Sequence, residues 1–202
     1  LVVVTSDHGE SLGAHGEATH GLFAYEETLR VPLIVAATDV APASLPGRSS
    51  WPARHVDVVP TIAASLGLPL PPGLPGEPLL SPSRRRPEDV SSYFESLSAS
   101  LNRGWAPLTG VMLGRRKYVD LPIPELYDLA TDPREQQNRH EEWRSQARVL
   151  ASLLESLPRD AEQNFRRSED LQTRRSLEAL GYVSSPAARP AQYGEDDDPK
   201  RL

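Results

Sequence analysis

The stretch Leu1-Val2-Val3-Val4-Thr5-Ser6-Asp7-His8-Gly9-Glu10 is the starting point for predicting the fold, because an apolar run changes there abruptly to polar residues. Residues 1–5 are largely β-branched and uniformly apolar, which is typical of a strand buried on both faces. A second run of this kind covers residues 31–37, and a polar, glycine-punctuated stretch with a short helix at 25–29 separates the two runs. This order of strand, loop, short helix and strand predicts an α/β fold with a parallel sheet.

The pattern changes twice downstream of this unit. Residues 57–67 predict a helix that has Asp57 as its cap and a glycine as its stop. Prolines and glycines are so frequent from residue 69 to 87 that neither helix nor strand persists, which indicates a surface crossover. Beyond the crossover we expect a small antiparallel sheet, with strands at residues 91–97, 106–113, 115–121 and 125–129.

The C-terminal part predicts two helices and a tail. Residues 141–157 carry apolar side chains at helical spacing, and a more polar helix at about 160–180 ends at a glycine. From residue 184 onward, Pro-Ala repeats and a run of four acidic residues predict disorder.

The composition excludes several classes of function. The 28 acidic residues outnumber the 22 lysines and arginines, and a net charge of −6 argues against a nucleic-acid partner, which needs a basic face. The chain has no cysteine, so disulfides, thiolate metal sites and thiol catalysis are excluded. No apolar run approaches the length of a membrane span. The opening on Leu1 inside an apolar run leads us to expect a fragment, and its cellular compartment stays open.

The strongest chemical signal lies directly after the first predicted strand. A carboxylate and an imidazole are metal ligands, and α/β sheets hold their sites at strand ends. Neighbouring strand side chains point to opposite faces, so Asp7 and His8 reach one ion only if the chain turns, which Gly9 permits. Three histidines and two glutamates between residues 8 and 20 favour this interpretation. In the alternative, Asp7 caps the next element, His8 packs against it, and the loop has no function.

Four motifs in order resemble the sulfatase family of the alkaline phosphatase superfamily, in its DHG-type bacterial form. Residues 2–35, with SDHGESLGAHG and then HGLFAYEETLRVPLIV, resemble the DHG-containing segment of the family. HVDVVPTIAASLGLPLP (55–71) resembles the Asp-x-x-Pro-Thr helix, and ELYDLATDPREQQN (125–138) resembles the Glu-Leu-Tyr-Asp-Leu…Asp-Pro-x-Glu-x-x-Asn segment. LEALGYVS (177–184) resembles the ending of many bacterial relatives, so the resemblance covers most of residues 1–184.

This resemblance implies roles for four residues. Asp7 and His8 would be two ligands of a divalent cation. Many sulfatases with Asn at the position of His8 bind calcium, whereas imidazole suits manganese or zinc better, so Ca²⁺ and Mn²⁺ both stay open. His20 falls where the family places a Lys or His that contacts the sulfate or its bridging oxygen, which makes it the candidate catalytic and substrate-binding residue. His15 would line the substrate pocket or only order the loop.

The nucleophile is expected outside this chain. The resemblance implies a formylglycine made from Cys or Ser in Cys/Ser-x-Pro-x-Arg, on an N-terminal part well upstream of the DHG segment, and we expect residues 1–202 to lack this motif. The string Leu80-Ser81-Pro82-Ser83-Arg84 places a leucine at the nucleophile position, so we interpret it as coincidence. Without the nucleophile and the remaining metal ligands, the isolated chain is expected to be inactive.

The resemblance also implies a domain organisation and a substrate class. Residues 1–82 would be the C-terminal part of a sulfatase catalytic α/β domain with an alkaline-phosphatase-like mixed or parallel sheet and flanking helices. A small antiparallel subdomain (83–138), C-terminal helices (139–183) and a disordered tail (184–202) would follow. The substrate would be a sulfate-ester small molecule or glycan. The alternatives are a phosphoester or phosphonate hydrolase or phosphotransferase of the same superfamily, and a non-catalytic remnant.

Overall fold

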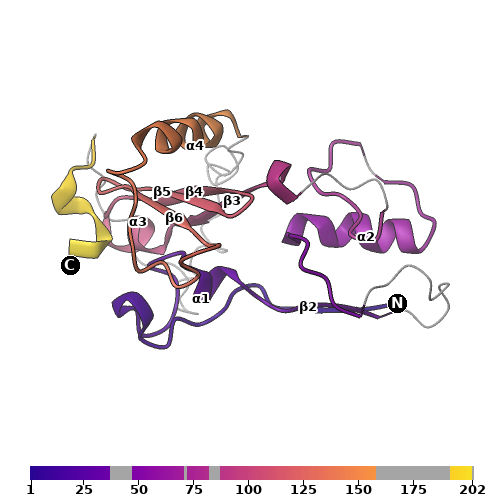
Figure 1. The fold of residues 1–202 in the computed structure, drawn as a ribbon. Helices are drawn as coiled ribbons and strands as arrows, with labels where there is room; N and C mark the ends of the chain where they lie inside the picture. Colours follow the sequence, from indigo (N-terminus) through magenta and orange to yellow (C-terminus); the bar gives the residue numbers. More distant parts are fainter. Residues whose placement is uncertain (37–46, 71, 82–86, 158–191, 202) are drawn as a thin grey trace.

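A computed structural model describes residues 1–36, 47–70, 72–81, 87–157 and 192–201 (Figure 1). The strands are β1 (Val2–Thr5), β2 (Leu33–Ala36), β3 (Ser91–Ser96), β4 (Leu108–Leu113), β5 (Arg116–Asp120) and β6 (Glu125–Asp128). The α-helices are α1 (Glu26–Leu29), α2 (Val58–Ser65), α3 (Ser98–Arg103) and α4 (Arg144–Ser156). Short 3₁₀ helices lie at Ala14–Gly16, His55–Asp57, Pro87–Asp89, Glu195–Asp197 and Pro199–Arg201. None of the described helices has the length and apolar character needed to cross a membrane.

Strands β3 to β6 form a four-stranded antiparallel sheet in the order β3-β4-β5-β6. A two-residue turn joins β4 to β5, and its first residue, Gly114, has a φ of 59°, which glycine adopts without strain. Within β4, a Cβ on Gly110 would lie 2.2 Å from the ring of Phe94, so glycine allows this ring to lie across the sheet. The predicted small antiparallel sheet, including its strand at residues 125–129, is confirmed.

The two faces of this sheet cover different parts of the chain. The loop between β1 and α1 packs on one face, through a core made of Phe23, Ala24, Tyr25, Phe94, Ala106, Leu108, Val119, Leu121, Tyr127 and Leu129. Helix α4 packs on the other face, through Val111, Tyr118, Leu126, Ala147, Leu150 and Leu154. Figure 1 shows α4 and α1 on opposite sides of the sheet. The helix predicted at residues 141–157 is thereby confirmed.

Strands β1 and β2 pair antiparallel, so the predicted parallel pairing is wrong. A parallel pair needs a crossover connection, usually a helix that runs the length of the strands. The only α-helix between β1 and β2 has four residues, and the chain instead returns through a loop. The predicted burial of both faces is also wrong, since Val2, Val4 and Ile34 on one face are about half exposed or more.

Asp57 stands at the N-cap position of α2, as predicted, but its side chain makes no capping hydrogen bond and instead holds the turn that leads into this helix. Its buried carboxylate accepts hydrogen bonds from the backbone N–H groups of Arg54 and Glu77, both at 2.9 Å, and from the Arg54 guanidinium at 2.8 Å. Burial would raise the pKa of Asp57, but these donors outweigh burial and hold its pKa below the usual value. Asp57 therefore joins α2 to two neighbouring segments.

The C-terminal residues 192–201 lie against the small sheet, whereas the sequence predicted disorder for residues 184–202. Figure 1 shows this segment beside α3. The fully buried Asp198 carboxylate accepts a hydrogen bond from the backbone N–H of Ile123 at 2.8 Å. The acidic run is ordered here because one of its carboxylates satisfies the connection between β5 and β6. Residues 184–191 and the helix predicted at 160–180 lie outside the described residues.

Candidate functional site

The loop that follows β1 turns at Gly9, which lies against the backbone of α1. The N–H of Gly9 donates a hydrogen bond to the carbonyl oxygen of Thr28 at 2.8 Å. A Cβ at this position would lie only 2.2 Å from the carbonyl oxygen of Glu27, and a backbone atom cannot move away as a flexible side chain can. Glycine is therefore required for the loop to rest on α1, and this contact fixes the two residues before it.

Asp7 and His8 lie on the same side of this turn. Their Oδ2 and Nε2 atoms are 3.9 Å apart, and both side chains are exposed, 89% for Asp7 and 45% for His8. The backbone N–H of His8 donates to the Asp7 carboxylate at 3.0 Å, and this hydrogen bond is the main cause that lowers the pKa of Asp7. Asp7 is therefore held as an anion with one oxygen directed towards the imidazole.

The ring of His8 is oriented by its own neighbour. Its Nδ1 lies 2.9 Å from the carbonyl oxygen of Gly9, and since a carbonyl only accepts, Nδ1 carries the hydrogen. This leaves the lone pair of Nε2 on the side of Asp7, in the arrangement that metal-ligating histidines commonly show. A cation bound at about 2.0–2.6 Å from each ligand atom can touch both groups across their 3.9 Å separation. These residues therefore fit a divalent cation.

His20 is paired with Glu10 across the loop. Its Nδ1 lies 2.5 Å from Glu10 Oε1, and its ring lies against that of His8 with the centroids 4.0 Å apart. Because the carboxylate accepts the Nδ1 hydrogen, the Nε2 atom of His20 is left for a ligand. His8, Glu10 and His20 each offer one ligand atom within 4.8 Å of the others, so His8 belongs to two alternative ligand sets.

His15 lies inside the loop rather than at its exposed edge. Its ring stacks on Tyr25 with the centroids 3.6 Å apart, and its side chain is only 13% exposed. Its backbone has a φ of 52°, which is uncommon for a residue other than glycine. The Nε2 atom lies 3.9 Å from Glu27 Oε2. Of the two roles predicted for His15, this placement favours ordering of the loop over contact with a substrate.

A second group of ligand-type side chains lies beneath the loop. His15, Glu27 and Glu135 offer atoms within 4.8 Å of one another. However, the Nζ atom of Lys117 lies 2.6 Å from Glu135 Oε1, and both side chains are fully buried. Lys117 thus already supplies a positive charge to Glu135, the buried carboxylate of this group, in the place where a metal ion would otherwise be needed.

His55, which the sequence left without a role, supports the turn from the other side. Its Nε2 lies 2.8 Å from the carbonyl oxygen of Ser6 and donates a hydrogen bond to it. The Ser6 hydroxyl in turn donates to the carbonyl oxygen of His8 at 2.6 Å. The turn that carries Asp7 and His8 is thus supported by α1 on one side and by the entry to α2 on the other.

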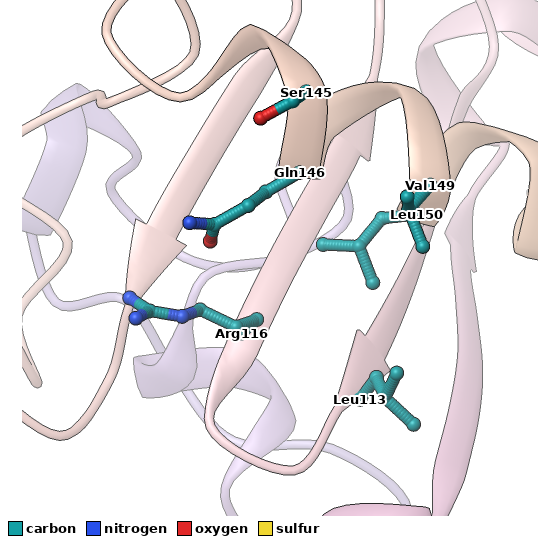
Figure 2. Close-up of a pocket in the computed structure, with 6 residues that line it drawn as sticks. All are labelled: Leu113, Arg116, Ser145, Gln146, Val149 and Leu150. Atoms are coloured by element: carbon teal, nitrogen blue, oxygen red, sulfur yellow. The ribbon is translucent and has the colours of Figure 1, made fainter.

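Figure 2 shows an open hollow of about 310 Å³ that is separate from this site. Its lining is mostly apolar and comes from α4 and the β4–β5 hairpin: Leu113, Arg116, Ser145, Gln146, Val149 and Leu150. Helix α4 lies on the face of the sheet that is opposite the loop with His8 and His20. The hollow therefore takes no part in the arrangement of the candidate site.

The expectation that the chain lacks a Cys/Ser-x-Pro-x-Arg string is wrong, because Ser44-Leu45-Pro46-Gly47-Arg48 matches it. Of this string, only Gly47 and Arg48 belong to the described residues. The string follows Asp7 and His8 in the chain, whereas the resemblance places the nucleophile well before them. A substitution of Ser44 can therefore test where the nucleophile lies.

Comparison with known proteins gives one family match and several relatives. Residues 1–68 match the family model described as Sulfatase. The chain is 31% identical over 139 residues to the uncharacterized sulfatase YidJ of Escherichia coli (strain K12), which covers 68% of this chain and 27% of that protein. It is 30% identical over 175 residues to the N-acetylglucosamine-6-O-sulfatase of Bacteroides thetaiotaomicron. This match covers 81% of this chain and 31% of that protein. The chain thus spans about a quarter to a third of the length of these relatives.

Solved structures share the fold at lower identity. The 2-O GAG sulfatase BT1596 matches with a TM-score of 0.60 and 21% identity, over 96% of this chain and 43% of that chain. The phosphonate monoester hydrolase of Agrobacterium radiobacter matches with a TM-score of 0.58 and 24% identity, over 77% and 34%. These likenesses confirm the predicted alkaline-phosphatase-like α/β fold. They do not decide between sulfate and phosphonate esters as the substrate, because enzymes for both kinds of ester share this fold.

Proposed function

The chain belongs to the sulfatase family of the alkaline phosphatase superfamily, and from this premise we propose that it forms part of a metal-dependent hydrolase of sulfuric esters. The proposal rests on the loop between β1 and α1, where a carboxylate and two imidazoles are held by hydrogen bonds on an exposed edge. Each of these side chains takes a separate role in it.

Asp7 and His8 are the two metal ligands that this chain supplies. Their ligand atoms lie 3.9 Å apart, and the hydrogen bond from His8 Nδ1 to the Gly9 carbonyl keeps Nε2 free for coordination. When bound, a divalent cation would polarise the sulfate oxygens and screen their negative charge. Ca²⁺ and Mn²⁺ are both candidates, and the nitrogen ligand favours Mn²⁺ because calcium sites are built from oxygen.

His20 acts on the leaving group of the ester. Its Nδ1 is occupied by Glu10, so Nε2 is the nitrogen left to hold a proton at the bridging oxygen of the ester. Negative charge develops on that oxygen as the S–O bond breaks, and a hydrogen-bond donor there stabilises it. Glu10 fixes the orientation of the ring and its tautomer, as the carboxylate partner of a catalytic histidine does.

The nucleophile in this proposal is a formylglycine that lies outside residues 1–202. The chain contributes two metal ligands, and a two-ligand site without its partners would bind a cation weakly. We propose a sulfated small molecule or glycan as the substrate, and the similarity to an N-acetylglucosamine-6-O-sulfatase favours a sulfated sugar.

A second candidate function is hydrolysis of phosphonate monoesters, which the likeness to the Agrobacterium radiobacter hydrolase supports. The two reactions would share the metal ligands and differ in the atom that is attacked, sulfur in one and phosphorus in the other. A phosphonate monoester and a sulfate monoester each carry a single negative charge, so the loop around His20 accommodates either on charge alone. A comparison of substrates is therefore needed to separate them.

The 3.9 Å separation of Asp7 Oδ2 and His8 Nε2 is the observation that carries the proposal. The test is to measure turnover of 4-nitrophenyl sulfate and 4-nitrophenyl phenylphosphonate by the full-length protein, before and after chelation and with Ca²⁺ or Mn²⁺ added back. The Asp7→Ala/His8→Ala variant is compared with His140→Ala/Glu141→Ala. The control pair is also an adjacent, surface-lying carboxylate and imidazole, 3.2 Å apart, and it lies away from the loop.

We expect chelation and the Asp7→Ala/His8→Ala variant to abolish sulfate hydrolysis, with an unchanged circular dichroism spectrum, while the control variant stays active. Higher turnover of the phosphonate than of the sulfate would favour the second candidate. Turnover that survives both chelation and the double substitution would rule out the metal assignment.

A further inference from the structure

We propose that Glu135 is a positioning residue for the candidate site, because its carboxylate fixes the helix on which the metal-binding turn rests. This inference rests on the proposed function, and it gives a role to the Asp-Pro-x-Glu-x-x-Asn motif, which contributes no residue to the site itself. Glu135 is the glutamate of that motif and lies in the turn after β6. Three features of its surroundings support this role.

The first feature is the backbone of Glu135. Its φ is 54°, in the left-handed region where glycine is the favoured residue and a larger side chain is strained. Its side chain is also fully buried, which is costly for a carboxylate. A glycine would relieve the strain and a neutral residue would avoid the burial. The presence of glutamate indicates that the carboxylate itself is needed.

The second feature is that the two carboxylate oxygens bind different elements. Oε1 lies 2.6 Å from Nζ of Lys117 on β5, and both side chains are fully buried. Oε2 accepts the backbone N–H of Glu26, the first residue of α1, at 2.6 Å. The residue before α1, Tyr25, makes no capping bond with its side chain. Glu135 thus serves as the cap of α1 from 109 residues away and ties it to the sheet.

The third feature is the contact between α1 and the candidate site. The carbonyl oxygen of Thr28 accepts the N–H of Gly9, and the carbonyl oxygen of Glu27 presses on Gly9 so closely that no Cβ fits. Gly9 is flanked by His8, a proposed metal ligand, and by Glu10, which orients the proposed leaving-group histidine. A displacement of α1 would therefore move both functional groups together. Their geometry depends on where Glu135 holds this helix.

A single hydrogen bond can be tested here, because Glu26 is the first residue of α1. Glu26→Pro removes the N–H that Glu135 accepts and leaves the pair with Lys117 intact. Proline suits the first helical position, and the extended backbone of Tyr25 (φ −81°, ψ 169°) suits a residue before proline. Glu26→Ala is the matched control, since it removes the same side chain and keeps the N–H.

Two measurements on the full-length protein follow. The first is the NMR shift of the His15 ring protons, which the stacked ring of Tyr25 shields at a centroid distance of 3.6 Å. The second is the ratio of kcat for an aryl sulfate, which has a good leaving group, to kcat for an alkyl sulfate, which has a poor one. Only the alkyl sulfate depends strongly on a proton held at the leaving oxygen.

We expect Glu26→Pro to move the His15 resonance towards its unfolded position and to lower kcat for the alkyl sulfate by about 100-fold, the size expected for a misplaced catalytic group. The kcat for the aryl sulfate is expected to fall less, and the melting temperature is expected to change little. Glu26→Ala is expected to resemble the wild type in both measurements. Glu135→Gln should move the same resonance, and it should also lower the melting temperature, because Lys117 is then buried without its charge partner.

Equal spectra and equal kcat ratios for Glu26→Pro and Glu26→Ala would overturn the inference. If the wild type hydrolyses no sulfate ester, the proposed function fails. The His15 resonance then decides by itself whether Glu135 positions the loop.

Discussion

Replacement of Lys117 by methionine tests how much the buried charge pair stabilises the protein. The Nζ atom and Glu135 Oε1 are 2.6 Å apart, and neither side chain has any exposed surface. At an effective dielectric constant of ~20 the attraction between unit charges at this distance is about 6 kcal/mol. Desolvation offsets part of it, and removal of one partner from a buried pair costs about 3–5 kcal/mol because a charge is left unpaired.

Methionine isolates the charge from the packing. It has nearly the length of lysine, and the Lys117 ammonium lies 5.2 Å from the centroid of the Phe94 ring and 5.8 Å from that of the Tyr25 ring, so an apolar group is accommodated there. Urea unfolding of Lys117→Met at pH 8 is expected to show a loss of about 3–5 kcal/mol in the free energy of unfolding. Adding Glu135→Gln should restore it to within about 1 kcal/mol, since both charges are then absent.

The loss should also depend on pH. Burial raises the pKa of Glu135, and in the wild type Lys117 opposes this effect. Without Lys117 the pKa of Glu135 is raised further, so folding favours its protonated form. Stability from such a group is present at low pH and is lost as pH rises through its folded pKa. The difference between Lys117→Met and the wild type should therefore be smaller at pH 5 than at pH 8.

Arg139→Met provides the control, because Arg139 and Glu142 form a partly exposed pair that contributes about 0–1 kcal/mol. The reasoning would be refuted if Lys117→Met cost no more than this control. It would also be refuted if the double variant with Glu135→Gln lost as much stability as the two single variants combined.

Four further outcomes can be checked on the same protein. Tyr127→Ala should lower the free energy of unfolding by about 3–5 kcal/mol, because the ring is buried. Turnover should be nearly kept, and a large loss of turnover at an unchanged melting temperature would contradict this. Gly9→Ala should abolish metal-dependent turnover because a Cβ has no room, whereas Gly47→Ala, where a Cβ meets nothing within 4 Å, should behave as the wild type. The lowered pKa of Asp57 gives the folded state stability that is present above about pH 4 and is lost as pH falls through the folded pKa. In Asp57→Asn, the free energy of unfolding should therefore fall less steeply as the pH is lowered below about 4. Ser44→Ala should leave kcat unchanged. A loss of turnover in this variant would place the nucleophile in this chain.

The sequence predicts elements best where local signals settle them. The short runs at residues 106–113 and 115–121 on either side of Gly114, and the helical spacing of residues 141–157, predict the sheet and α4 that the structure contains. The direction in which β1 and β2 pair was not predicted correctly, because a uniformly β-branched strand does not indicate whether its partner runs parallel or antiparallel. The segment that connects the two strands did contain a signal, because the short helix predicted in it is not long enough for the crossover that a parallel pair needs.

The candidate site divides in the same way. The proximity of Asp7 and His8 follows from a turn that Gly9 imposes between neighbours, which local chemistry can predict. The pairing of His20 with Glu10 was missed because ten residues of irregular loop separate them, and no periodicity relates positions in such a loop. The role of Glu135 was still harder to foresee, since its partner on α1 is 109 residues away.

The motif at residues 125–138 gains a physical meaning from these contacts. Its first glutamate, Glu125, accepts the hydroxyl of Tyr25 at 3.1 Å, and its second, Glu135, accepts the N–H of the next residue, Glu26. Two carboxylates ten positions apart in the motif thus hold adjacent residues at the start of α1. A single bond would leave the helix free to pivot, whereas two fix both its position and its direction. The small sheet therefore serves as the support that sets the geometry of the loop, and substitutions that remove the bonds of these two carboxylates to Tyr25 and Glu26 should impair the proposed chemistry.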